Sequence, residues 1–157
     1  MSENYIVING KRAELTEEQM KTLGVKVKVR GERKMNKYYS KTHEWVKIDG
    51  DEATVGVSAY TTRELGDITY VELPKEGSDV IVDDTIGVVE SVLAAADIHS
   101  PMSGTVIAVN KNLNDDPGIV SNFPEDKGWI CKLENIDLDE LEDLLTEEEY
   151  VKYLKTL

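Results

Sequence analysis

The sequence predicts a mainly β protein that ends in helices. From Tyr38 onward, short apolar runs of strand length recur about every ten residues, and turn-forming residues separate them. After Asn135 the apolar spacing changes from alternation to the three-and-four spacing of a helix. Many short strands with regular turns are typical of a sandwich or a flattened barrel. We therefore expect one β body followed by C-terminal helices.

Residues 1–36 read as an appendage, and residues 37–157 read as the main domain. YIVING is a short strand that closes on an Asn-Gly turn signal. Thr16 to Gln19 is a capping box that begins a helix, and Gly24 is its stop signal. VKVKV then alternates as a second strand. The expected unit of strand, helix and strand is too small to bury much surface by itself.

The β body begins with two strands, 45–48 and 53–57, joined by the tight turn signal Asp49-Gly50-Asp51. Ser58 is placed to cap a short helix over 59–65, which Gly66 ends. Further strands are expected wherever an apolar or alternating run lies between turn residues: 68–73, 79–82, 85–91, 96–99, 105–109 and 129–133.

Two helical segments close the chain. Asp137 or Asp139 is placed to cap a helix over LDELEDLL, and Thr146 with Glu149 forms a capping box before YVKYL. The leucines and tyrosines of these segments fall on helical faces. We interpret both stripes as packing surfaces against the β body and not as a cofactor site.

Composition limits the classes of function. A net charge of −13 opposes binding to nucleic acid or to anionic membranes, so proteins with basic docking faces are the expected partners. The chain has no apolar run of the roughly 20 residues that cross a bilayer, and its start lacks the pattern of a signal peptide, so we expect a cytoplasmic location.

Cys131 alternates within WICKL and is interpreted as a small buried hydrophobe. His43 and His99 lack partners at metal-ligand spacing, so no metal is expected, and Asp97 with His99 is interpreted as a surface pair.

Four segments, in order, resemble the H protein of the glycine cleavage system. They are THEWV from Thr42, ATVGVSAYTTRELGDITYVELPKEG, GVVESVLAAADIHSPMSGTVIAVN and DDPGIVSNFPEDKGWICKL. The resemblance runs from about Lys37 to the C-terminus. It implies a lipoyl-domain-like barrel-sandwich hybrid of two antiparallel sheets, with a carrier hairpin exposed at one end and helices at the C-terminus.

One residue of the hairpin departs from the family. The family's hairpin reads Glu-Ser-Val-Lys-Ala, and its lysine carries lipoic acid in amide linkage because a nitrogen nucleophile must attack an activated lipoyl group. This chain instead has Glu90, Ser91, Val92, Leu93 and Ala94. Leu93 has no nucleophilic atom, and the nearest lysines, Lys75 and Lys111, lie outside the predicted hairpin. We therefore expect an exposed Leu93 and no attached lipoate, in either a natural paralogue without the arm or a form whose lysine was replaced.

The resemblance also implies a cleft against which the family's loaded arm folds back. The residues that match its lining are Thr42, Glu44 and Asp97. Glu44 could hold a cationic amine through a charge-assisted hydrogen bond. The alternative, that Glu44 is an ordinary strand residue and Asp97 satisfies a turn, stays equally open.

Three classes of function follow. The first is a non-enzymatic H-protein-like module that docks with the glycine cleavage enzymes without carrying the aminomethyl group. The resemblance implies glycine decarboxylase, aminomethyltransferase, dihydrolipoamide dehydrogenase and the lipoylating enzymes as partners. The second is a repurposed binding protein that uses the vacant cleft or the apolar hairpin tip. An enzyme ranks last, because the chain offers no phosphate loop, metal cluster or nucleophile with its base.

Overall fold

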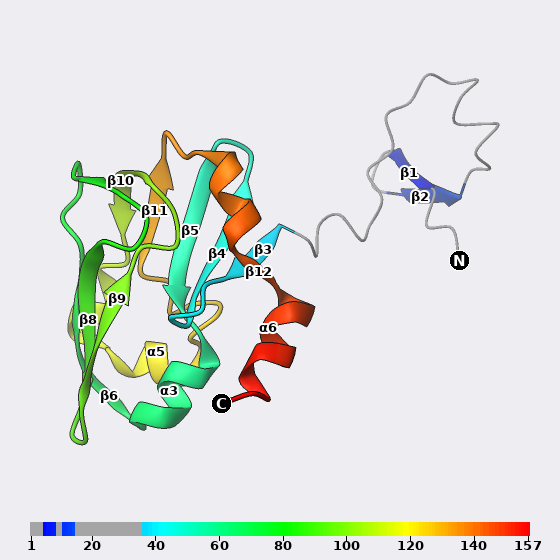
Figure 1. The fold of residues 1–157 in the computed structure, drawn as a ribbon. Coiled ribbons are helices and arrows are strands. Elements are labelled where there is room, and N and C mark those ends of the chain that lie inside the picture. Colours follow the sequence, from blue (N-terminus) through cyan, green and yellow to red (C-terminus); the bar gives the residue numbers. More distant parts are fainter. Residues whose placement is uncertain (1–4, 9–10, 15–35) are drawn as a thin grey trace. The chain divides into compact units, whose positions relative to one another are not determined.

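The computed structural model describes residues 5–8, 11–14 and 36–157 (Figure 1). The chain divides into two compact units, Met1–Asn36 and Lys37–Leu157. In the first unit, β1 (Tyr5–Ile8) pairs antiparallel with β2 (Lys11–Glu14). The strand predicted at YIVI is therefore present, while β2 was not predicted. The helix predicted from Thr16 and the VKVKV strand lie outside the described residues.

The second unit consists of two antiparallel sheets, as predicted (Figure 1). The larger sheet has the order β12-β3-β4-β5-β11-β10-β7, and the smaller has the order β6-β8-β9. The strands of the larger sheet are β3 (Lys37–Tyr39), β4 (Glu44–Asp49), β5 (Glu52–Val57), β7 (Asp79–Val80), β10 (Gly104–Val109), β11 (Cys131–Glu134) and β12 (Leu145–Thr146). Those of the smaller are β6 (Ile68–Glu72), β8 (Thr85–Ser91) and β9 (Ala95–His99).

The main hydrophobic core draws on both sheets. Alternation along each strand turns one set of side chains inward. Val46 and Val55 of the larger sheet belong to the same buried cluster as Val89 and Ile98 of the smaller one. Three short helices, α3 (Ala59–Leu65), α4 (Asn112–Asp115) and α5 (Gly118–Asn122), each add a buried apolar side chain to this cluster. The fold is thus held by burial between the sheets and beneath these helices.

The short helices correct two expectations. α3 begins and ends as predicted, with Gly66 at φ 80°, but the Ser58 hydroxyl makes no capping bond and instead hydrogen-bonds the Tyr150 hydroxyl. α4 and α5 were not predicted, because helices of four and five residues are too short to show apolar periodicity.

Three element boundaries also differ from the prediction. The strand expected at 129–133 begins at Cys131, because the Trp129 amide donates to Asp126 O in the preceding turn. The strand expected at 79–82 ends at Val80. The LDELEDLL segment forms a 3-10 helix, η1 (Leu138–Asp143), in which the Asp137 side chain accepts from the Asp139 amide.

The last helix, α6 (Glu147–Leu154), packs on aromatic residues of β3 and β4. Its predicted capping box between Thr146 and Glu149 is present. The Tyr150 ring stacks on Tyr39, with centroids 4.3 Å apart and planes 2° apart. Trp45 completes this buried cluster, so the tyrosine stripe is a packing surface, as predicted. Among the described helices, none has the length and apolar character required to cross a membrane.

Candidate functional site

The tip of the β8–β9 hairpin projects from one end of the body (Figure 1). Val92 and Leu93 form the tip, and their side chains are 87% and 76% exposed. The Ser91 hydroxyl accepts hydrogen bonds from the backbone amides of Leu93 (3.1 Å) and Ala94 (3.3 Å), and the Ser91 amide donates to Ala94 O (2.9 Å). A serine that closes a turn in this way fixes the backbone locally. Position 93 is thus presented to solvent by an ordered turn, as expected.

Glu90 lies at the base of the tip. It is half-buried and stands opposite Tyr70 of β6 on one side and Ala95 of β9 on the other. Its carbonyl oxygen accepts a hydrogen bond from the Thr69 hydroxyl at 3.2 Å. Residue 90 therefore belongs to the sheet and anchors the tip to its neighbouring strands.

Glu44, at the start of β4, is buried, with only 2% of its surface exposed. Its Oε1 accepts hydrogen bonds from the hydroxyls of Ser40 (2.8 Å) and Thr42, and its Oε2 accepts one from the His99 backbone amide (3.2 Å). Burial raises the pKa of Glu44 above its usual value, although these hydrogen bonds act in the opposite direction. Both oxygens are thus engaged within the protein, and the carboxylate links the two sheets.

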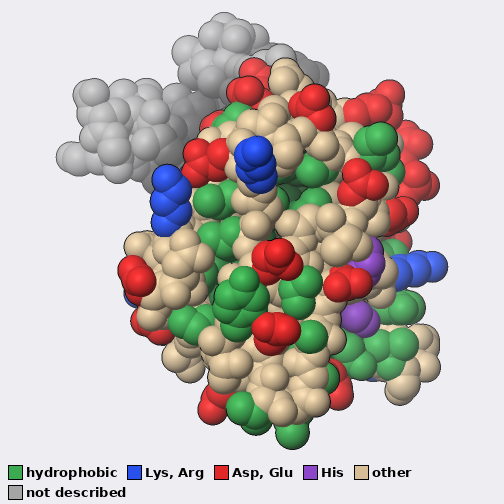
Figure 2. Space-filling model, turned by 90° about the vertical axis from the view of Figure 1, so that its left-hand side faces the viewer, with side chains coloured by type: hydrophobic (Ala, Val, Ile, Leu, Met, Phe, Trp, Pro, Cys, Tyr) green, Lys and Arg blue, Asp and Glu red, His purple; other side chains and the backbone are tan. Residues whose placement is uncertain are grey.

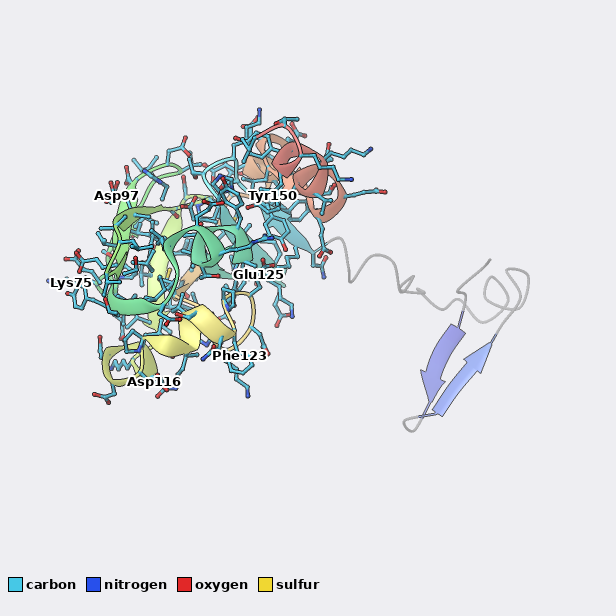
Figure 3. All side chains as sticks on the ribbon, turned by 90° about the horizontal axis from the view of Figure 1, so that it is seen from below. Lys75, Asp97, Asp116, Phe123, Glu125 and Tyr150 are labelled. Atoms are coloured by element: carbon cyan, nitrogen blue, oxygen red, sulfur yellow. The ribbon has the colours of Figure 1, made fainter. Side chains whose placement is uncertain are left out.

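The structure brings only two of the three predicted cleft residues into contact. The Thr42 hydroxyl bonds Glu44, whereas Asp97 lies on β9, exposed and opposite Val88. Within residues 36–157, the Asp97 carboxylate has no hydrogen-bond or ion-pair partner. Figure 3 shows Asp97 on one side of the body, with Tyr150 and Glu125 on the other.

His99 is the residue that sequence reasoning misplaced. The sequence predicts a surface pair with Asp97, but the Nδ1 of His99 lies 3.7 Å from Glu44 Oε2. That nitrogen is buried and has no hydrogen-bond partner among the described residues. Strand alternation signalled that residues 97 and 99 share a face, but nothing local indicated that Glu44, 55 residues earlier, lies against His99.

Glu125 is a second hydrogen-bonded carboxylate, half-buried, that the sequence did not single out. It accepts hydrogen bonds from Lys37 Nζ (2.7 Å), the Tyr39 hydroxyl and the Ala59 backbone amide (2.9 Å). Burial by itself would raise the pKa of Glu125, but these donors hold it below its usual value. The residue joins β3 to the start of α3, which is a structural role.

The Tyr150 hydroxyl makes a third polar junction. It lies 2.7 Å from Ser58 Oγ and 2.8 Å from His43 Nδ1. His43 has a left-handed backbone with φ 74°, and its ring packs on Tyr60 at 4.3 Å between centroids. Burial lowers the pKa of His43 and raises that of Tyr150 to about 12. The junction connects α6, α3 and the loop before β4.

Cys131 fits its expected role as a buried hydrophobe. Its side chain lies in the core, and burial raises the pKa of the thiol to about 12. A buried thiol that stays protonated near neutral pH is a weak nucleophile.

Residues 36–157 define a two-sheet β module with an ordered, exposed hairpin tip. The sequence model of the family "Glycine cleavage H-protein" matches residues 37–157. The chain therefore belongs to the glycine cleavage H-protein family. Residues 1–36 lie outside that match.

Individual relatives agree with this assignment. The chain is 50% identical over 112 residues to a glycine cleavage system H protein of Acinetobacter baumannii, with 71% of the chain and 90% of the relative covered. It is 49% identical over 119 residues to an H protein of Schizosaccharomyces pombe described as mitochondrial, with 76% and 70% covered. The crystal structure of an H protein from Mycobacterium marinum superposes with a TM-score of 0.69 at 30% identity, covering 78% of this chain and 98% of the other.

Membership defines the class of activity. Glycine cleavage H proteins are lipoyl carriers and not enzymes, and they work with glycine decarboxylase, aminomethyltransferase and dihydrolipoamide dehydrogenase. A covalent lipoyl group needs an amine, and the hairpin strands and tip, residues 85–99, contain no lysine. The residues of this hairpin therefore do not fit an amide-linked lipoate.

Proposed function

We propose that the chain is an H-protein module that docks with the glycine cleavage enzymes but carries no lipoate and so cannot transfer the aminomethyl group. One observation carries this proposal: Leu93, a hydrocarbon side chain, occupies the exposed tip position where the family resemblance puts the lipoyl lysine. The same chemistry follows whether Leu93 is natural or replaces a lysine.

We expect docking to persist without the lipoyl arm, because docking and lipoate attachment depend on different residues. Attachment needs a single amine, whereas a docking surface is spread over the fold. The features that shape the hairpin are present, including the Ser91 turn bonds and the pairing of Glu90 with both neighbouring strands. The proposed partners are glycine decarboxylase, aminomethyltransferase, dihydrolipoamide dehydrogenase and the lipoylating enzymes.

A second candidate is a binding protein that uses the tip or the cleft. The exposed apolar pair Val92 and Leu93 favours the tip. The cleft is less favoured, because Glu44 is buried and both of its carboxylate oxygens already accept hydrogen bonds within the protein. Of the three cleft residues, only Thr42 and Asp97 are exposed to a soluble amine. Stabilisation of the chain by methylamine or lipoamide in a thermal-shift assay would support this second candidate.

Reconstituted glycine decarboxylation tests the first proposal. The enzymes and the lipoylated H protein of one relative are assayed with this chain as a replacement and then as an excess addition. We expect no turnover when the chain replaces the carrier, and competitive inhibition when it is added in excess. Turnover with the chain as sole carrier would contradict the loss of carriage. Absence of both inhibition and measurable binding to the purified enzymes would contradict docking.

The cytoplasmic location also stays a prediction, since the Schizosaccharomyces pombe relative is described as mitochondrial. Imaging of the tagged full chain in its own cell tests it, and localisation to an organelle would contradict it.

A further inference from the structure

One face of the small sheet is turned away from the core. The β6-β8-β9 register places Tyr70, Glu90 and Ala95 in one row and Glu72, Val88 and Asp97 in the next. Residues directly opposite each other in an antiparallel sheet project to the same side. The residues of the alternate row, Val71 and Val89, are buried in the core. The six residues of the first two rows therefore form what we call the outer sheet face.

The outer sheet face is acidic and partly apolar. Tyr70 is 53% exposed, Glu72, Ala95 and Asp97 are also exposed, and Val88 and Glu90 are half-buried. Strands β6, β8 and β9 contain no lysine or arginine, and the nearest in the sequence is Lys75, three residues after Glu72. Figure 2 views this side, where acidic and hydrophobic side chains are intermingled across the centre.

The face continues into the hairpin tip, because the same two strands carry both. Glu90 lies two residues before Val92, and Ala95 lies two residues after Leu93. An exposed tyrosine beside aliphatic side chains is a common anchor of protein interfaces. The carboxylates around it set the charge of the complementary surface, since opposite potentials match across an interface. The net charge of −13 disfavours a membrane or a nucleic acid as the occupant.

We propose that the outer sheet face and the hairpin tip together form the docking surface of this chain. The partner is a protein that presents lysine or arginine side chains to Glu72, Glu90 and Asp97 and an apolar slot to Val92 and Leu93. Tyr70 packs at the centre, where an arginine of the partner can lie over its ring. This inference rests on the proposed function, because the partner is one of the glycine cleavage or lipoylating enzymes.

Charge reversal with a matched control tests the surface. Glu72→Lys changes the face, whereas Glu142→Lys makes the same change of net charge at an exposed position of η1. Tyr70→Ala removes the apolar anchor. Binding of each variant to purified aminomethyltransferase, glycine decarboxylase and lipoate ligase of one relative is measured by surface plasmon resonance at low and physiological salt. Urea unfolding of each variant checks that it is folded.

We expect Glu72→Lys and Tyr70→Ala to weaken binding to at least one enzyme by about tenfold, and Glu142→Lys to change it by less than about twofold. Equal weakening of binding by Glu72→Lys and Glu142→Lys would overturn the proposed docking surface, because binding would then depend only on the net charge of the chain. Unchanged binding by both face variants would overturn it and leave the proposed function standing. No binding by the parent chain to any of the three enzymes would overturn the surface and count against the docking part of the proposed function. Self-association that Glu72→Lys abolishes would identify a second copy as the occupant and also overturn the proposal.

Discussion

The backbone amide of His99 donates a hydrogen bond to the buried carboxylate of Glu44, 3.2 Å away, and so ties β9 of the small sheet to β4 of the large one. Leu93 lies six residues before His99, about 20 Å along an extended strand. The β9 end of the hairpin is thus attached to the body, while the tip is exposed.

Glu44→Gln should destabilise the protein most at low pH. Burial raises the folded-state pKa of Glu44 above the usual value of 4.5. As pH rises above that value, the unfolded chain loses its proton first, so the stability that Glu44 contributes falls until pH passes the folded-state pKa. Urea unfolding of parent and variant from pH 4 to pH 8 should show a difference that shrinks as pH rises. A difference that grows with pH would contradict the raised pKa.

Glu125→Gln should show the opposite pH dependence. Its donors hold the folded-state pKa of Glu125 below 4.5, so its contribution is present above the unfolded value and is lost as pH falls through the folded one. The same urea series should give the largest cost near neutral pH and a smaller cost below about pH 4. Parallel behaviour of the two glutamine variants would show that the two carboxylates are not distinguished by their environments.

Gly56→Ala should be strongly destabilising. Gly56 stands opposite Trp45 in the β4–β5 pair, and a Cβ atom there would lie 2.6 Å from the indole ring. Overpacking of a core usually costs about 1–3 kcal/mol. Gly118→Ala is the control, because its nearest neighbour is an Asp116 side-chain oxygen at 3.3 Å, and it should change the free energy of unfolding by less than about 0.5 kcal/mol. Equal effects would show that the ring can move aside.

Tyr150→Phe should cost about 1–3 kcal/mol, because it leaves the buried Ser58 hydroxyl without its partner. The His43 imidazole loses the same partner. Tyr153→Phe is the matched control, since its hydroxyl makes one exposed bond of 3.4 Å to Lys41 O. Thermal or urea unfolding of both variants measures the difference. A tolerated Tyr150→Phe would mean that water replaces the hydroxyl.

Leu93→Lys should restore lipoylation. Position 93 is exposed on an ordered turn, so the substitution should alter stability by well under about 1 kcal/mol. Incubation with lipoate ligase, ATP and lipoate should add one lipoyl group to Leu93→Lys, as measured by intact mass, and none to the parent or to the control Leu93→Met. Modification of the parent would reveal another attachment point. An unreactive lysine variant would show that the recognition surface of the hairpin has changed.

Local signals predicted most of the β body. Turn residues and strand alternation located β4, β5, β6, β8, β9 and β10 to within one residue or so at each end. The capping box of Thr146 and Glu149 located α6, because both of its bonds form within one turn. The family resemblance then supplied the two-sheet arrangement, which alternation alone left open between a sandwich and a barrel.

Local sequence signals do not predict contacts between residues that are far apart in the sequence. Glu125 binds Lys37 and Tyr39, which lie 88 and 86 residues away, so no spacing in the sequence marks it. Ser58 had the right identity for a cap, but Tyr150, 92 residues later, competes for its hydroxyl. Burial of Glu44 likewise depends on β9 lying over β4, a contact 55 residues apart in the sequence that no local pattern marks.

Cys131 is the sole thiol of the chain and lies within the core. Because it is shielded in the folded state, its alkylation requires the protein to open, so the labelling rate in the absence of denaturant reports how often the core is exposed. The same shielding leaves the surface clear for selective chemistry. A cysteine introduced at position 93 would be the only readily reactive one, and a disulfide-bearing or fluorescent arm of chosen length could be attached there without removing any native residue but the leucine.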